Sequence, residues 1–83
     1  MSRSRKISKD NEIKYIQLGL NISYYRKLIG YTQEELAEEA NLSRSYLSTI
    51  EAPNEVKTVS LEVLFDIAKV LKVEPSKLLE FRQ

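Results

Sequence analysis

The 83-residue sequence contains no cysteine, no histidine and no tryptophan. Without cysteine the chain has no disulfide, no thiolate metal site and no thiol nucleophile. Without histidine it lacks the most common general base and the most common zinc ligand. The densest acidic group is interpreted as a solvated helix face and consists of Glu34, Glu35, Glu38 and Glu39. These features predict that the protein is not an enzyme and holds no metal and no cofactor.

Long apolar segments are absent too, since the longest uninterrupted apolar run is Val63–Phe65. A run of that length is far too short to span a membrane. The N-terminus is basic, but no apolar segment follows it, which argues against a signal peptide. We therefore expect a cytoplasmic protein that makes no contact with a membrane.

The net charge of +1 is small but unevenly distributed. The first nine residues hold four of the 13 basic side chains and none of the 12 acidic ones, and these four are Arg3, Arg5, Lys6 and Lys9. We expect residues 1–10 to form a basic, flexible arm and residues 11–83 to form one folded domain. The remaining acidic excess should face away from any anionic partner.

Apolar residues recur at helical spacing along the chain, and no segment alternates as a strand would. A first helix is expected to start at Asp10 or Asn11 and to end near Ile29, before Gly30. Its inner face consists of Leu18, Ile22, Tyr25 and Ile29. Gly19 costs about 1 kcal/mol relative to Ala within a helix, so the helix could bend or begin there.

The C-terminal half predicts two more helices. Ser60 can cap a helix that reaches Leu71, and its apolar stripe consists of Leu61, Leu64, Ile67, Ala68 and Leu71. Pro75 suits the first position of a last short helix that ends at Phe81. Together with two helices between Thr32 and Glu51, this pattern predicts an all-α fold, a compact bundle of five helices.

The most informative segment is Thr32–Glu51. Thr32 and Glu35 have the spacing of a capping box, Asn41 tolerates the left-handed conformation that ends a helix, and Ser43 can cap the next helix. The side chains expected to face the core are Leu36, Ala37, Ala40, Leu42, Leu47 and Ile50. The outward positions of helix 43–51 are Arg44, Ser45, Ser48 and Thr49. One arginine among short hydroxyls suits the major groove of DNA.

Residues 18–79 resemble the lambda-repressor-like, Cro/C1-type (XRE family) helix-turn-helix domain. The matching positions are Arg26, Gly30–Gln33, Leu36, Ala37, Ser43, Leu47, Ser48, Ile50, Glu51, Ser60, Leu61, Leu64, Ile67 and Ala68. The resemblance is strongest to small stand-alone repressors and to controller proteins of restriction-modification systems, of bacterial or phage type. It implies a lambda-repressor-like bundle with the helix-turn-helix motif at residues 33–52, in the second and third helices.

The implied function is sequence-specific binding of double-stranded DNA by a transcription regulator, expected to be a dimeric repressor that reads the major groove with helix 43–51. The alternative is an antitoxin-like or other interaction module that binds a partner protein. No small-molecule ligand is expected. The basic arm either contacts DNA or is simply a solubilising terminus, and both interpretations stay open.

The resemblance and the residue types together assign roles within the motif. Base reading is assigned to Arg44, Ser45, Ser48 and Thr49, although Arg44 can equally contact a phosphate. Phosphate binding is assigned to Thr32, Gln33, Tyr46, Lys57 and Thr58. Arg26 and Glu51 are expected to form a structural ion pair, and Thr32, Ser43 and Ser60 to cap helices. The loop after Glu51 lacks the glycine usual in the family, so its grip on phosphates should be weaker.

A second apolar stripe on the first helix has no evident core partner and consists of Ile13, Leu20, Tyr24 and Leu28. A small domain that reads DNA specifically is expected to form a two-fold dimer on a palindromic operator. The residues considered for the interface are Leu78, Leu79 and Phe81 first, and Leu20 and Tyr24 second. A monomer remains a possible alternative, as does a protein partner on this stripe.

Overall fold

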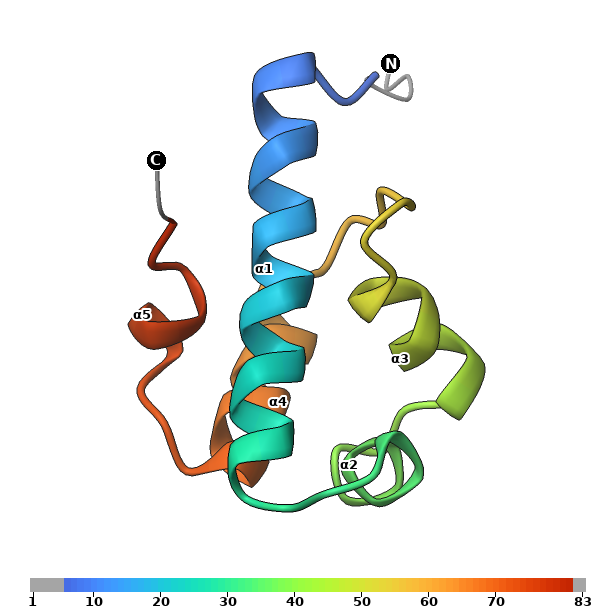
Figure 1. Ribbon diagram of the computed structural model, residues 1–83, viewed down its shortest axis with the longest axis vertical. Helices are drawn as coiled ribbons and strands as arrows, with labels where there is room; N and C mark the ends of the chain where they lie inside the picture. Colours follow the sequence, from blue (N-terminus) through green and yellow to red (C-terminus); the bar gives the residue numbers. More distant parts are fainter. Residues whose placement is uncertain (1–5, 82–83) are drawn as a thin grey trace.

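A computed structural model of the chain describes residues 6–81 (Figure 1). These residues form five helices and no strand, namely α1 (Lys9–Leu28), α2 (Gln33–Glu39), α3 (Arg44–Glu51), α4 (Leu61–Leu71) and α5 (Pro75–Leu78). The predicted all-α fold of five helices is thus confirmed. Arg3 and Arg5 of the expected basic arm lie outside the described residues.

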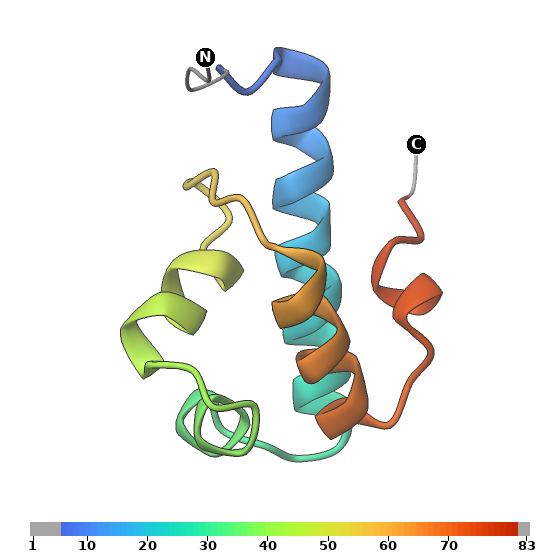
Figure 2. The same ribbon diagram turned by 180° about the vertical axis from the view of Figure 1, so that it is seen from behind.

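The long helix α1 stands at the centre of the arrangement, with α2 and α3 on one side and α5 on the other (Figure 1). Seen from behind, α4 crosses α1 between these two groups (Figure 2). α1 contacts α3, α4 and α5, while α2 contacts α3 and α4. The buried core between them consists of Leu18, Ile22, Leu36, Ala37, Ala40, Leu47, Ile50, Leu64, Ile67, Ala68, Leu71 and Leu78.

Helix α1 begins earlier than the sequence predicted. Its N-cap is Ser8, whose hydroxyl oxygen accepts a hydrogen bond of 3.2 Å from the backbone N–H of Asn11. Serine caps a helix as well as Asp or Asn does, and Asp10 then lies in the first turn, where a negative charge is favourable. The expected caps Asp10 and Asn11 were therefore wrong, and Lys9 belongs to the helix rather than to an arm.

Two apolar positions expected to face the core are exposed instead. Ile29 is the C-cap of α1 and has left the helical backbone, so the helical spacing that placed it beside Ile22 no longer applies. Leu61 stands in the first turn of α4 and is 64% exposed. Helical side chains point back toward the N-terminus, which carries Leu61 beyond the packed body of the bundle. The buried stripe of α4 therefore begins at Leu64.

Helix α5 is shorter than predicted and ends at Leu78 rather than Phe81, although Pro75 does occupy its first turn. Leu78 is completely buried in the core between α1, α4 and α5. Leu78 therefore cannot contribute to a dimer interface, and its inclusion among the interface residues was wrong. Leu79 and Phe81 keep part of their surface exposed.

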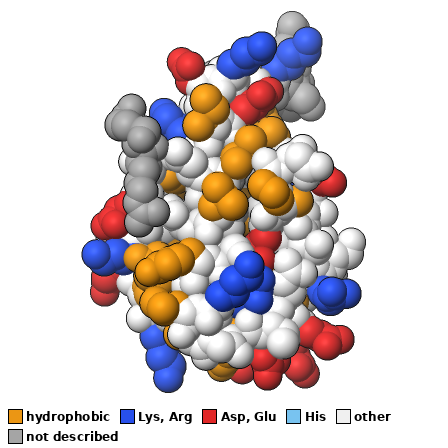
Figure 3. Space-filling model, viewed as in Figure 1, with side chains coloured by type: hydrophobic (Ala, Val, Ile, Leu, Met, Phe, Trp, Pro, Cys, Tyr) orange, Lys and Arg blue, Asp and Glu red, His pale blue; other side chains and the backbone are white. Residues whose placement is uncertain are grey.

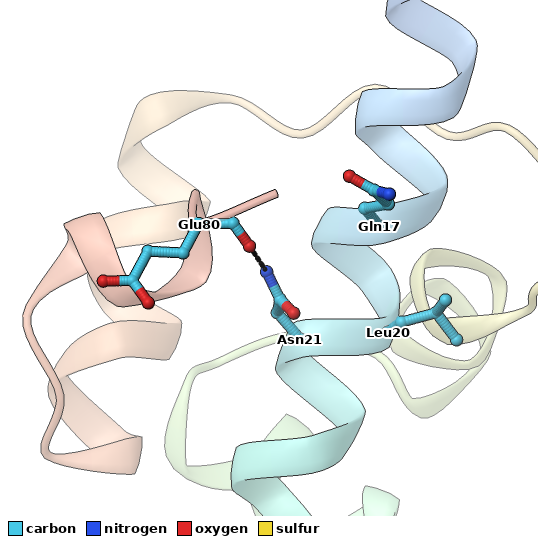
Figure 4. A pocket seen from close by; sticks show the side chains of 4 residues that line it. All are labelled: Gln17, Leu20, Asn21 and Glu80. Atoms are coloured by element: carbon cyan, nitrogen blue, oxygen red, sulfur yellow. Dashed lines mark hydrogen bonds between the residues drawn. The ribbon is translucent and has the colours of Figure 1, made fainter. Parts of the chain in front are cut away.

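The segment after α5 is held to α1 by a side chain that the sequence did not single out. Asn21 Nδ2 donates hydrogen bonds of 3.0 Å to the carbonyl oxygens of Leu78 and Glu80. Figure 4 shows the second of these bonds, in a shallow pocket between α1 and the C-terminal segment that Gln17 and Leu20 also line. An asparagine on α1 thus fixes the position of backbone 57 to 59 residues away.

Gly19 does not interrupt α1, which is continuous from Lys9 to Leu28. Glycine is required there because a Cβ atom would overlap the carbonyl oxygen of Ile50 in α3. The helix therefore does not begin at Gly19, and the glycine is explained by packing against α3 instead. The missing side chain lets α1 and α3 approach until backbone meets backbone.

Candidate nucleic-acid interface

The motif α2–turn–α3 has the local structure that its capping residues predict. The Thr32 hydroxyl accepts from the N–H of Glu35 at 3.0 Å, and the Glu35 carboxylate accepts from the N–H of Thr32 at 2.8 Å, which completes the capping box. Asn41 has a φ of 60°, which turns the chain out of α2. The Ser43 hydroxyl accepts from the N–H of Tyr46 at 3.0 Å and starts α3.

The two faces of α3 are sharply divided. Leu47, Ile50 and Glu51 are buried against the bundle, while three of the four positions assigned to base reading are exposed, namely Arg44, Ser45 and Ser48. An eight-residue helix is about 12 Å long at 1.5 Å per residue, comparable to the width of the DNA major groove. The exposed face therefore has the size and the polar groups needed to contact base edges.

Thr49, the fourth of these positions, is half-buried, and its hydroxyl donates a hydrogen bond of 3.0 Å to the carbonyl oxygen of Ser45. A threonine hydroxyl has a single proton to donate. In this conformation Thr49 can offer a base only its methyl group or an oxygen lone pair. Its contribution to base reading is therefore narrower than that of the exposed serines.

Arg26 of α1 and Glu51 at the end of α3 form a buried, bidentate ion pair. Arg26 Nε donates to Glu51 Oε2 and Arg26 Nη2 donates to Glu51 Oε1, each at 2.9 Å. Only 8% of Arg26 and 7% of Glu51 is exposed. Arg26 Nη1 also donates to the carbonyl oxygen of Tyr31 at 2.7 Å. The guanidinium thus joins α1 to the end of α3 and to the residue that precedes the cap of α2.

Gln33 is connected to the same carboxylate, which sequence reasoning did not anticipate. Its side-chain Nε2 donates to Glu51 Oε1 at 3.0 Å, and the residue is half-buried. The sequence predicted a phosphate-binding glutamine and gave no sign of this hydrogen bond, because the partner lies 18 residues away. Neither the capping box nor the helical spacing of α2 contains information about that contact.

Of the other residues assigned to phosphate, Thr32 is the N-cap of α2, Tyr46 lies in α3, and Lys57 and Thr58 lie in the loop after α3. The Lys57 ammonium is 5.5 Å from the centre of the Tyr46 ring, in the arrangement of a cation–π contact. Tyr46 is half-buried on α3, whereas Lys57 and Thr58 are exposed. The ring therefore connects the loop cation to the helix whose outer face carries Arg44.

Acidic side chains gather at the lower right of the molecule in Figure 3, over α2, while apolar patches follow α1 along the front. Among the acidic residues, Glu39 accepts a hydrogen bond of 3.0 Å from the Tyr31 hydroxyl. This hydrogen bond, together with the charge of Glu39, raises the pKa of Tyr31 above its usual value of 10.0. The tyrosine therefore stays protonated throughout the physiological range.

Within residues 6–81 no three potential metal ligands of the His, Cys, Asp or Glu type converge. In the same range, no helix has the length and apolar character needed to cross a bilayer. The features that remain are an exposed polar helix, a loop cation held by an aromatic ring and a buried polar network beneath them. Fold and site together define a helix-turn-helix domain.

Comparison with known proteins agrees with this class. Residues 22–78 match the model of the helix-turn-helix family. The HTH-type transcriptional regulator SinR of Bacillus subtilis (strain 168) is 41% identical over 63 residues, which cover 76% of this chain and 56% of SinR. Control protein C.SmaI of Serratia marcescens is 37% identical over 68 residues, which cover 82% of this chain and 77% of that protein.

The fold has solved counterparts as well. The crystal structure of SinR, the master regulator for biofilm formation, in complex with DNA matches with a TM-score of 0.71 and 41% identity, over 76% of this chain and 98% of that one. The present chain spans about half the length of full SinR, at 56%. The chain belongs to the helix-turn-helix family of the Cro/C1 (XRE) type.

Proposed function

We propose that this protein is a sequence-specific transcription regulator that binds double-stranded DNA with α3 in the major groove. The observation that carries the proposal is the division of α3, whose inner face is anchored in the core and whose outer face presents Arg44, Ser45 and Ser48. A recognition helix needs this combination, because base contacts require exposed polar groups on a rigid support. The similarity to SinR, whose structure has been solved in complex with DNA, supports DNA as the ligand.

The proposed division of labour follows from the side chains. Arg44 donates two hydrogen bonds to guanine O6 and N7, which discriminates against other bases by about 1–3 kcal/mol. Ser45 and Ser48 contact base edges, and the Thr49 methyl group contacts a thymine methyl. The residues proposed to bind phosphates are Thr32, Gln33, Tyr46, Lys57 and Thr58.

The regulator is proposed to act as a homodimer on a palindromic operator and to repress transcription. Two-fold symmetry places the recognition helices of the two copies in successive major grooves, about 34 Å apart. Exposed apolar surface on α1 and on the C-terminal segment supports an interface there. It is contributed by Leu20 and Tyr24 on α1 and by Leu79 and Phe81 after α5. Action on DNA implies a cytoplasmic location, and no catalytic activity is assigned.

Selection of binding sites from a random duplex library with purified protein tests the proposal. We expect an enriched, two-fold symmetric sequence with half-sites about one helical turn apart. The matched control is the Arg44→Ala, Ser45→Ala, Ser48→Ala variant, which alters only exposed positions of α3 and should fold normally. This variant is expected to bind duplexes without enriching any sequence.

A folded protein that enriches no sequence would overturn the proposal. It would favour the second candidate, an antitoxin-like module that binds a partner protein. The observation behind that candidate is the exposed stripe on α1, where Ile13 is 60%, Tyr24 56% and Leu28 64% exposed.

A further inference from the structure

The carboxylate of Glu51 joins three helices through charged or polar hydrogen bonds. Its Oε1 atom accepts from Arg26 Nη2 of α1 at 2.9 Å and from Gln33 Nε2 of α2 at 3.0 Å, while Oε2 accepts from Arg26 Nε. Glu51 itself is the last residue of α3. Every buried polar side-chain atom of the described residues has a hydrogen-bond partner, so the network is complete.

We propose that Glu51 is a positioning residue for DNA binding, which holds the Gln33 side chain in place for a DNA phosphate. The inference rests on the proposed function, since it concerns how the phosphate contact is prepared. A primary amide nitrogen has two hydrogens. One Nε2 hydrogen of Gln33 is held by Glu51, which directs the other away from the carboxylate.

A held side chain binds at a lower entropic cost than a mobile one. An exposed glutamine samples many rotamers and loses that freedom when it contacts a ligand. Gln33 is half-buried and already bonded to Glu51 in the free protein, so most of this freedom is lost on folding rather than on binding. The contact with DNA is therefore preorganised.

The ion pair also prevents repulsion between the Glu51 carboxylate and the phosphate. A carboxylate so close to the proposed phosphate contact would repel the phosphate if its charge were uncompensated. Arg26 pairs with Glu51 in bidentate geometry, and both residues are at least nine-tenths buried. The network therefore carries no net charge and presents a neutral amide donor to the DNA.

A double-mutant cycle tests whether Glu51 acts through Gln33. Glu51→Gln, Gln33→Ala and the combined variant are compared with the wild type for affinity toward a selected duplex, at one temperature where all are folded. We expect Glu51→Gln to weaken binding about 5- to 10-fold in the wild-type background, the net size of one ordinary hydrogen bond. In the Gln33→Ala background the same change should cost less than about 2-fold, because the coupled partner is already gone.

Lys57→Ala serves as the matched control, since Lys57 lies over the Tyr46 ring and is assigned a separate phosphate. The loss of affinity from Lys57→Ala should add to that from Glu51→Gln. Lys57→Ala should also reduce the salt dependence of binding, whereas Gln33→Ala removes no charge and should leave that dependence unchanged. The loss through Gln33 should also be equal for selected and scrambled duplexes, as a phosphate contact requires.

Equal losses from Glu51→Gln in both backgrounds would overturn the inference, as would a Gln33→Ala variant with wild-type affinity. If Glu51→Gln does not fold, side-chain ¹⁵N relaxation of Gln33 in the free wild-type protein decides the matter. An ordered amide supports positioning, and an amide as mobile as exposed glutamines contradicts it. A wild-type protein that binds no duplex at all would instead count against the proposed function.

Discussion

Gly19 of α1 lies against the carbonyl group of Ile50 in α3, so closely that a Cβ atom at Gly19 would overlap the carbonyl oxygen. The next nearest atoms to such a Cβ are the Ile50 carbonyl carbon and the Glu51 Cα, so all three close atoms belong to the backbone. Backbone cannot move aside as the end of a flexible side chain can. The distance between α3 and α1 is therefore set by the absence of one methyl group.

Gly19→Ala should consequently destabilise the fold, although alanine is the better helix former. The propensity gain is about 1 kcal/mol. The overpacking cost should reach about 3 kcal/mol, the upper end of the usual range, because the obstacle is backbone, and we expect a net loss of about 2 kcal/mol. Chemical denaturation measures it. Gly30→Ala is the control, because a Cβ there meets nothing and only the φ of 78° is unfavourable. A Gly19→Ala variant as stable as the wild type would show that α3 can shift freely.

Glu51→Ala should weaken folding before it weakens any specific base contact. Removing the carboxylate leaves the Arg26 guanidinium buried without its partner, which costs about 3–5 kcal/mol. Thermal unfolding measures the loss, since about 1 kcal/mol shifts the Tm of a domain of this size by roughly 4–8 °C. Lys77→Ala breaks the exposed Lys77–Glu80 pair at 3.5 Å and should change stability by less than about 1 kcal/mol. An unchanged Tm for Glu51→Ala would refute this account.

Arg44→Ala should relax sequence preference without affecting the fold. We expect the selected site to lose discrimination at one base pair in each half-site, by about 1–3 kcal/mol, with the Tm unchanged. Competition between duplexes that differ at single positions measures it. Arg44→Lys keeps the charge but not the fork of donors, so its base preference should also weaken. If Arg44→Ala reduced affinity equally for all duplexes, Arg44 would be a phosphate contact instead.

Lys57→Ala should reduce the salt dependence of DNA binding. One lost phosphate contact lowers the slope of log affinity against log salt by about 0.9. Tyr46→Leu keeps the charge but removes the ring that lies 5.5 Å from the ammonium, so the slope should persist while affinity falls about 2- to 5-fold, the worth of an exposed cation–π contact. Titrations at several salt concentrations distinguish the two variants, and equal slopes for Lys57→Ala and the wild type would contradict the assignment.

Charge introduced at the proposed interface should separate the two copies. Leu79→Glu and Tyr24→Glu are each expected to raise the dimer dissociation constant at least about 10-fold, because burying an unpaired carboxylate is costly. Sedimentation measures the effect, with Leu61→Glu as a control at an exposed leucine of α4 outside the interface. If Leu79→Glu and Tyr24→Glu both self-associate as the wild type does, the proposed location of the interface is contradicted.

Leu78→Ala should act differently, destabilising the monomer fold by about 2–5 kcal/mol because Leu78 is completely buried.

Local signals carried most of the sequence-based prediction. The caps Thr32, Ser43 and Ser60 depend on a side chain and an N–H three residues ahead, and all three bonds are present. Helical spacing likewise identified the core faces of α2 and α3. The predictions for Leu61 and Ile29 were wrong because periodicity does not reveal where the packing against a helix ends, as at Leu61, or where the helix itself ends, as at Ile29.

Contacts between distant residues supplied what the sequence did not. Gly19 was interpreted from its own helix propensity, although its role depends on Ile50. Gln33 was interpreted from its place after a cap, although its partner Glu51 lies across the motif. Leu78 was grouped with exposed neighbours because a four-residue helix has too few positions to show which side is buried.

The separation of the two faces of α3 has an evolutionary consequence. Leu47, Ile50 and Glu51 secure the helix, while Arg44 and Ser48 contribute nothing to the core. Under the proposed function, mutations at the outer positions exchange one operator for another without a folding penalty. A gene duplication followed by a few codon changes would then yield a second regulator that no longer competes for the ancestral site, so that new regulatory circuits can diverge on an unchanged scaffold.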